Sequence, residues 1–187
     1  MSRKLNSLAA ACAALFTAVA QAAPLDADGQ WRAFDVDDLT ATSGGLEWVD
    51  LEGKALDFSF TLASKAILRV VDAGAYSGDR FELFNGTSSM GLTSVGAAGG
   101  TLSPPWTNFD AAFGDHAHYS YAELLLEPGT YDFSGVLRVS ALDEFNQALN
   151  ATVGAVSLTA VPVSGAGLLF GLASAVLGLA ARRRHLV

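Results

Sequence analysis

Two histidines stand one residue apart in His116-Ala117-His118, shortly after the carboxylates of Asp110 and Asp115. On a β-strand, side chains two positions apart point to the same face, so this pair could chelate one metal ion with a carboxylate as third ligand. In a loop, the same residues would have a surface or hydrogen-bonding role. The aromatic residues around them favour the loop interpretation, and metal binding by His116 and His118 is the alternative.

A second group of possible ligands lies near the start of the chain, in Asp26-Ala27-Asp28-Gly29. Carboxylates at alternate positions open many calcium loops, but the downstream glutamate of an EF-hand is missing here. A looser structural calcium site at Asp26 and Asp28 remains, and its alternative is a solvated acidic arm. Apart from this calcium, we expect no cofactor.

Aromatic residues offer a third possibility, binding of carbohydrate. Trp48 and Trp106 would stack on sugar rings if they were exposed and aligned, whereas burial between two sheets would make them core residues. The sequence leaves both outcomes open.

Catalytic motifs are missing from the sequence. It has no nucleophile-elbow serine motif, zinc-protease helix, phosphate loop or dinucleotide fingerprint. Acidic pairs are abundant, but a glycosidase needs two carboxylates at a set separation in space, which spacing along the chain does not reveal. We therefore predict a protein that is not an enzyme, with a secreted hydrolase as the less favoured alternative.

The elements that position these residues are predominantly strands. Leu56, Phe58, Phe60 and Leu62 alternate with polar residues, which predicts a strand with one apolar face. The apolar run at 66–71 predicts an interior strand. Asn85-Gly86 predicts a type I′ hairpin turn after the strand at 80–84.

Further strands are predicted at 31–39, 46–51, 121–126, 131–141 and 151–161, with a bend at Gly135 and a long loop between 96 and 121. About eight or nine short strands with frequent turns indicate an all-β fold, an antiparallel β-sandwich of the jelly-roll kind.

The stretch 23–160 has the length of one domain and a strongly acidic composition. It contains all 19 acidic residues and 6 basic ones, a formal charge of −13, against −8 for the whole chain. Such a charge repels phosphates, so we exclude nucleic acid as a partner. The single cysteine, Cys12, precedes this stretch, which therefore has no disulfide.

The N-terminal 22 residues have the pattern of a secretory signal peptide. Arg3 and Lys4 precede an apolar run, and small residues at Ala20 and Ala22 form a cleavage motif. We expect export and cleavage after Ala22.

The C-terminal segment, 161–187, combines three features. Val161-Pro162 opens it, residues 163–181 carry no charge, and Arg182, Arg183 and Arg184 follow. Nineteen uncharged residues are just long enough for a transmembrane helix, and the arginines would stay on the cytoplasmic side. The preceding domain would then face outward.

This order of Val-Pro, apolar helix and arginine cluster resembles the PEP-CTERM sorting signal of Gram-negative bacteria that make exopolysaccharide. Val163-Ser164 stand where the usual signal has Glu-Pro. The resemblance implies recognition by an exosortase-type transpeptidase, transient anchoring in the inner membrane and release to the cell surface or extracellular matrix. A plain single-pass anchor is the alternative.

These features together predict a non-catalytic surface protein with a structural or adhesive role in an exopolysaccharide layer, such as the matrix of a biofilm. A carbohydrate-binding module is the alternative function.

Overall fold

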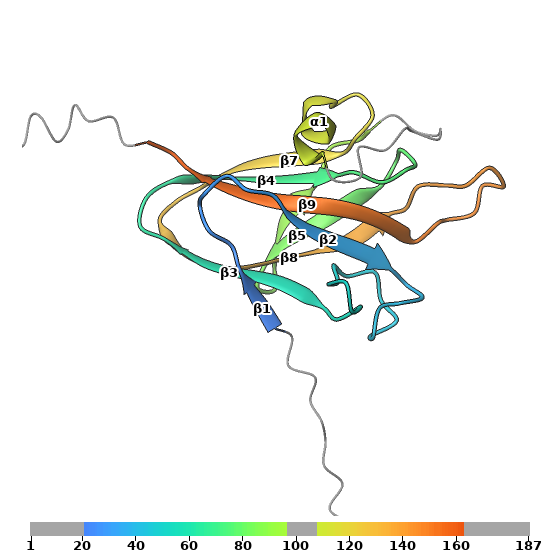
Figure 1. The fold of residues 1–187 in the computed structure, drawn as a ribbon, viewed down its shortest axis with the longest axis horizontal. Helices are drawn as coiled ribbons and strands as arrows, with labels where there is room; N and C mark the ends of the chain where they lie inside the picture. The colour runs from blue at the N-terminus through green and yellow to red at the C-terminus, as the bar shows by residue number, and fades with distance from the viewer. Residues whose placement is uncertain (1–20, 97–107, 163–187) are drawn as a thin grey trace, which may run out of the picture.

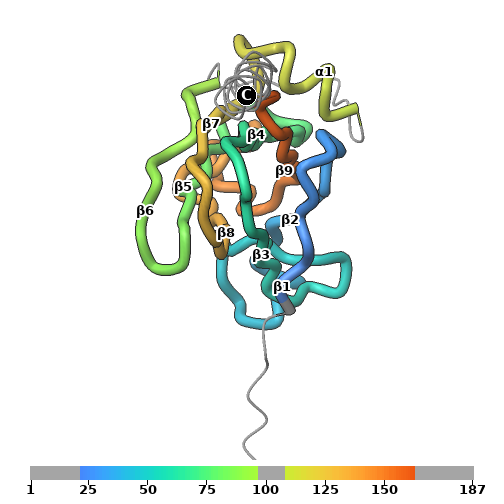
Figure 2. The backbone as a smooth tube through the Cα atoms, turned by 90° about the vertical axis from the view of Figure 1, so that its left-hand side faces the viewer, coloured from blue at the N-terminus to red at the C-terminus, as the bar shows by residue number. Residues whose placement is uncertain are grey.

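The computed structural model describes residues 21–96 and 108–162, which form two β-sheets packed face to face (Figure 1 and Figure 2). The elements, in chain order, are β1 (Gln21–Pro24), β2 (Arg32–Asp37), β3 (Leu56–Leu62), β4 (Ala66–Asp72), β5 (Arg80–Asn85), β6 (Ser88–Leu92), α1 (Phe109–Gly114), β7 (Tyr121–Leu126), β8 (Gly129–Val139) and β9 (Ala151–Ala160). The predicted all-β, sandwich-like fold is confirmed.

The two sheets have five and four strands. The larger has the order β1-β3-β8-β5-β6 and the smaller β2-β9-β4-β7. Every pairing is antiparallel except β1 with β3, which run parallel. In Figure 2 the two sheets lie on opposite sides of the core.

The core forms where the apolar faces of the two sheets meet. Phe58, Phe60 and Leu62 of β3 are buried, as their alternation predicts, and β4 is an interior strand between β9 and β7. Both sheets contribute to one hydrophobic cluster.

The segment predicted as a strand at 46–51 is a short connection between the sheets instead. Glu47 bridges Val136 of β8, while Val49 bridges Asp35 of β2. The backbone N–H of Trp48 donates to the carbonyl of Gly135 at 3.0 Å. The segment contacts one sheet and then the other, so it has no continuous partner strand.

Gly135, where the sequence predicts a bend, is required by packing. A Cβ at this position would lie 2.3 Å from the ring of Trp48, and the pairing of β5 with β8 continues past it. Trp48 therefore fills the space that the missing side chain leaves. Near the end of the strand predicted at 131–141, Val139 is 44% exposed and so lies outside the core.

The β5–β6 hairpin differs from the predicted type I′ turn by one residue. Asn85 is the last residue of β5 and pairs with Ser88, so Gly86 and Thr87 form the turn. Of the two predicted positive φ angles, only that of Gly86 is present, at 56°. Asn85 instead accepts a hydrogen bond from the backbone N–H of Asp132 at 3.0 Å and so links to β8.

Helix α1 lies in the region predicted as a long loop. The side chain of Asn108 caps it by accepting from the N–H of Ala111 at 3.1 Å. Phe109 and Ala112 are buried, and Phe113 lies under the guanidinium of Arg69 from β4. The helix therefore covers part of the outer face of the four-stranded sheet (Figure 1).

Both ends of the domain adjoin the predicted processed segments. The expected cleavage after Ala22 falls within β1. The predicted transmembrane helix at 163–181 and the arginines 182–184 lie outside the described residues. Within the described part of the chain, no helix is long and apolar enough to cross a membrane.

Candidate functional site

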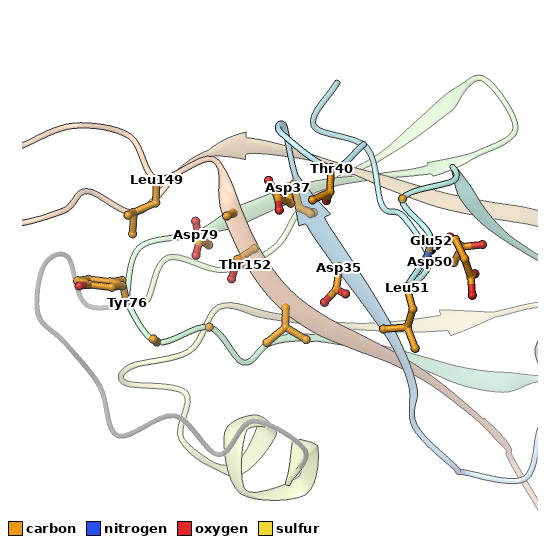
Figure 3. Close-up of a pocket in the computed structure, with 16 residues that line it drawn as sticks. Asp35, Asp37, Thr40, Asp50, Leu51, Glu52, Tyr76, Asp79, Leu149 and Thr152 are labelled. Atoms are coloured by element: carbon orange, nitrogen blue, oxygen red, sulfur yellow. Dashed lines mark hydrogen bonds between the residues drawn. The ribbon is translucent and has the colours of Figure 1, made fainter. Parts of the chain in front are cut away.

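A pocket of about 730 Å³ opens at the end of the sandwich where β2 and β4 end and β9 begins (Figure 3). Five of its lining residues are acidic, and none of the described residues that line it is basic. The acids are Asp35, Asp37, Asp50, Glu52 and Asp79. We call this cavity the acidic pocket.

The rim of the acidic pocket comes from β2 and the loop after it. Partial burial raises the pKa of Asp35, and the nearby charge of Asp37 raises it further. Asp50 behaves in the opposite way, because hydrogen bonds from the backbone N–H groups of Lys54 and Glu52 lower its pKa. Asp50 is therefore held in its charged form, whereas Asp35 takes up a proton more readily than an ordinary aspartate.

Two buried carboxylates lie deeper in this end of the sandwich. Asp72, the last residue of β4, is 0% exposed, and Asp79 is 2% exposed. Burial raises the pKa of Asp72 to about 7, with a further contribution from the charge of Asp79. Burial also raises the pKa of Asp79 to about 6. Aspartates are rarely buried without a cation beside them, so the pair requires an explanation.

The local fold positions Asp72 through its neighbours. Its Oδ1 accepts from the backbone N–H of Gly74 at 3.1 Å, which turns the chain after β4, and from the hydroxyl of Thr152 at 3.0 Å. Its Oδ2 is buried without a hydrogen-bond partner among the described residues. A buried acceptor left unpaired typically costs about 1–3 kcal/mol.

A residue of a different loop holds Asp79 in place. Its Oδ1 accepts from the backbone N–H of Ala141 at 2.7 Å, which ties the loop before β5 to the loop after β8. The hydroxyl of Thr152 also lowers the pKa of Asp79, against the effect of burial. Figure 3 shows Thr152 next to Asp79 at the inner end of the acidic pocket.

No basic side chain among the described residues pairs with either carboxylate. Arg80 follows Asp79 directly in the sequence, yet its guanidinium donates to the carbonyl of Thr93 at 2.9 and 3.1 Å. The charge of the pair is therefore not balanced by an arginine or a lysine.

The histidines proposed as metal ligands do not share a strand face. Both lie in a turn after α1. His116 stacks on Tyr121 with ring centroids 3.7 Å apart, whereas Nδ1 of His118 lies 2.8 Å from a carboxylate oxygen of Asp115. The premise of a strand is thus wrong, and the loop interpretation describes their positions.

Asp26 and Asp28 are exposed and do not converge on a common point with other acids. Asp28 accepts from the backbone N–H of Gln30 at 2.8 Å and pairs with Arg32 at 3.1 Å. Among the described residues, no group of three or more His, Cys, Asp or Glu side chains is placed to hold a metal ion. Calcium at Asp26 and Asp28 stays a prediction without a visible ligand cluster.

Trp48 is a core residue, which corrects its place in a sugar-binding platform. It is 1% exposed, stacks on Phe34 at 4.0 Å and has three further aromatic rings around it. Trp106, its proposed companion, lies outside the described residues. Trp31 donates its indole N–H to Asp110 at 2.8 Å and packs on α1.

Sequence reasoning missed the buried pair. A signal was present, because Asp72 directly follows the apolar run 66–71 and Asp79 directly precedes an apolar-alternating strand. An acid at the end of an interior strand lies at the edge of the core, where burial is expected.

Comparisons with known proteins add little to this geometry. No protein-family model matches the chain, and no curated protein matches it. Among solved structures, the pre-peptidase C-terminal domain of a collagenase from Bacillus anthracis is similar, with 10% identity and a TM-score of 0.39 over 75% of this chain and 95% of that chain. A likeness of this degree does not extend to function. The class of this protein therefore follows from its structure, which is an all-β sandwich with an acidic pocket at one end.

Proposed function

We propose that this protein is an exported, non-catalytic surface protein with a structural or adhesive role in an exopolysaccharide layer. The direction of β9 is the observation that supports this role best. The strand begins beside the acidic pocket, at Ala151 and Thr152, and ends at Ala160, close to the predicted membrane segment. At about 3.3 Å per residue, the pocket lies roughly 30 Å from Val161 along the strand.

This arrangement gives the domain two functionally different ends. In Figure 1, β2 and β4 run toward the end where the pocket lies, and β9 runs from that end toward the tail. A tail in the membrane would leave the acidic pocket facing away from the bilayer, toward the extracellular polymer.

The same end carries exposed apolar side chains. Leu39 and Leu51 are each 91% exposed, and Phe145 is 72% exposed. The side chain of Asn150 donates to Asp38 at 3.0 Å and joins two of the loops at this end. Exposed apolar groups among charged ones are typical of contact surfaces, which favours adhesion by this end.

Sorting by an exosortase-type enzyme is the first part of the proposal to test. The intact mass of the protein would be measured from its host with and without the sorting transpeptidase. We expect loss of the arginine tail only when the enzyme is present. An R182A/R183A/R184A variant should stay unprocessed, whereas the matched control R138A, on the surface of the sandwich, should be processed normally. An intact C-terminus in normal cells would reduce the tail to a simple anchor.

Carbohydrate binding, the alternative function, depends on exposed aromatic residues. Since Trp48 is buried, Trp106 is the remaining candidate of the proposed pair. Glycan-array binding by the wild type and by W106A would separate the functions. Saturable binding that disappears in a folded W106A variant would overturn the purely structural role.

A secreted hydrolase is the less favoured alternative, and the acidic pocket is where its chemistry would take place. Carboxyl groups with raised pKa values in a cleft are typical of general acids. A screen of glycan and ester substrates would test it. Turnover that is abolished by D79N, with the fold retained, would overturn the non-catalytic assignment.

A further inference from the structure

We propose that Asp72, Asp79 and Thr152 form a binding site for a divalent metal ion of the calcium class at the inner end of the acidic pocket. The proposal does not depend on the exported role. It rests on the ligand atoms, their burial and the route by which an ion would reach them.

The first argument is the unpartnered oxygen. Asp72 is fully buried, and its Oδ2 has no hydrogen-bond donor among the described residues. Its Oδ1, in contrast, accepts from Gly74 and Thr152. The turn after β4 and the hydroxyl on β9 thus hold the carboxylate in place while one oxygen stays available to a ligand.

The second argument is the charge around that oxygen. Thr152, which donates to Asp72 at 3.0 Å, lies next to Asp79 in Figure 3, so the two carboxylates flank the same hydroxyl and have the same charge. Two carboxylates brought together inside a protein require a proton or a cation between them, because an uncompensated buried charge is strongly unfavourable. Lysine and arginine side chains of the described residues do not supply that cation.

The third argument is space and access. Gly74 donates its backbone N–H to Asp72, and a Cβ at this position would come within 2.3 Å of the Thr152 hydroxyl oxygen. Gly74, Asp79 and Thr152 all line the acidic pocket. Asp79 thus lies at the pocket itself, and Asp72 is joined to the pocket lining through its bonds to Gly74 and Thr152. The acidic rim at Asp35 and Asp37 would attract cations to this end of the sandwich.

The ligand chemistry selects the class of ion. The donors of the proposed site, two carboxylates and a hydroxyl, are all oxygens, and this set suits hard cations. Calcium accepts an irregular set of 6–8 oxygens that can include water, whereas magnesium demands a near-ideal octahedron. With only two carboxylates, the affinity should lie in the range of extracellular calcium modules, about 10⁻⁴–10⁻³ M.

The test measures thermal unfolding and direct binding with the purified full-length protein, kept in solution by a non-ionic detergent because of its apolar C-terminal segment. The melting temperature would be followed in CaCl₂, in MgCl₂ and in NaCl of equal ionic strength, after treatment with a chelator. Isothermal titration with CaCl₂ would give the stoichiometry. The site variant is D72N/D79N, which keeps the size of both side chains.

A matched control is E127Q/D132N, which removes two exposed carboxylates that do not line the pocket and belong to no predicted metal site. We expect 10 mM CaCl₂ to raise the melting temperature of the wild type and of this control by about 4 °C, with one ion bound per chain. The site variant should fold and lose both the shift and the binding. T152V offers a second variant, in which weakened binding is expected because the hydroxyl is lost.

Two outcomes would overturn the proposal. One is a wild type that shows neither a calcium-specific shift nor stoichiometric binding, which would mean that the pair holds a proton. The other is a D72N/D79N variant that binds calcium as the wild type does. Neither outcome would affect the test of sorting, since that depends on the tail alone.

Discussion

At the scale of single residues, Asp72 and Asp79 link protonation to folding. In the metal-free protein their pKa values, about 7 and about 6, lie above the ordinary value of 3.8. The folded state therefore binds more protons than the unfolded state between about pH 4 and pH 7, and stability falls as the pH rises through this window. Tyr119, whose pKa is raised by burial and by the charge of Asp72, titrates above it.

We predict that, with a chelator present, the wild type is less stable at pH 8 than at pH 5. D72N/D79N should lose most of this slope and be more stable than the wild type at pH 8, by on the order of 2 kcal/mol. Urea denaturation at the two pH values measures the difference. The groups with lowered pKa, Asp28, Asp50 and Glu82, act below this window and in the opposite direction. Equal pH slopes for the wild type and the variant would contradict the prediction.

At the scale of elements, the contact between Trp48 and Gly135 joins the connection at 46–49 to β8. A methyl group on Gly135 would overlap the indole ring, which is enclosed by other aromatic rings and cannot move away. We predict that G135A destabilises the protein by about 3 kcal/mol or more, measured by urea denaturation.

The control for this prediction is G114A. Gly114 ends α1, and a Cβ there would meet no atom within 4 Å. This substitution should change stability by no more than about 0.5 kcal/mol. Similar losses in the two variants would show that the indole ring does not constrain position 135.

Elements with a strong local pattern were predictable from the sequence. The strand at 56–62 has the predicted bounds because its alternation matches one buried face, and the strand at 121–126 also agrees. Helix α1 was not predictable, since six residues are too few for helical periodicity. The 46–49 connection resembles a strand in composition, but its two partners belong to different sheets and only the tertiary structure reveals this.

The candidate site was predictable to a smaller extent. Acidic composition indicates cation binding in general, but the sequence directs attention to Asp26 and Asp28, which are solvent-exposed. Asp72 is the last residue of β4, and Asp79, 7 positions later, directly precedes β5. Both lie beside Thr152, which belongs to a third strand, β9. Such a meeting depends on sheet order, with β9 beside β4, which no local pattern contains.

At the scale of the whole molecule, the N-terminal segment is part of the fold. Leu25 is 3% exposed in the core, and the backbone N–H of Gly29 donates to the carbonyl of Leu158 at 2.8 Å. After cleavage at Ala22, Ala23 and Pro24 would remain to pair with Phe58 and Ser59 of β3.

We therefore predict that the fragment 23–160 unfolds in one cooperative transition. A fragment that starts at Trp31 should be less stable by about 3 kcal/mol, because it loses the buried Leu25 and the pairing beside β9. Denaturation followed by circular dichroism would compare the two fragments. Equal midpoints would show that residues 23–30 do not contribute to the domain.

The position of β9 also has a mechanical consequence. The strand lies between β2 and β4, antiparallel to both, and the chain continues from it into the tail. Hydrogen bonds between antiparallel strands run across the strand axis. A pull on the tail, directed along β9 away from the acidic pocket, would load both rows of bonds in shear, so that many must break together. In the proposed surface role, drag by flow or by a moving polymer would be resisted through the shared load of these rows, and the weakest direction would be sideways peeling from an edge strand.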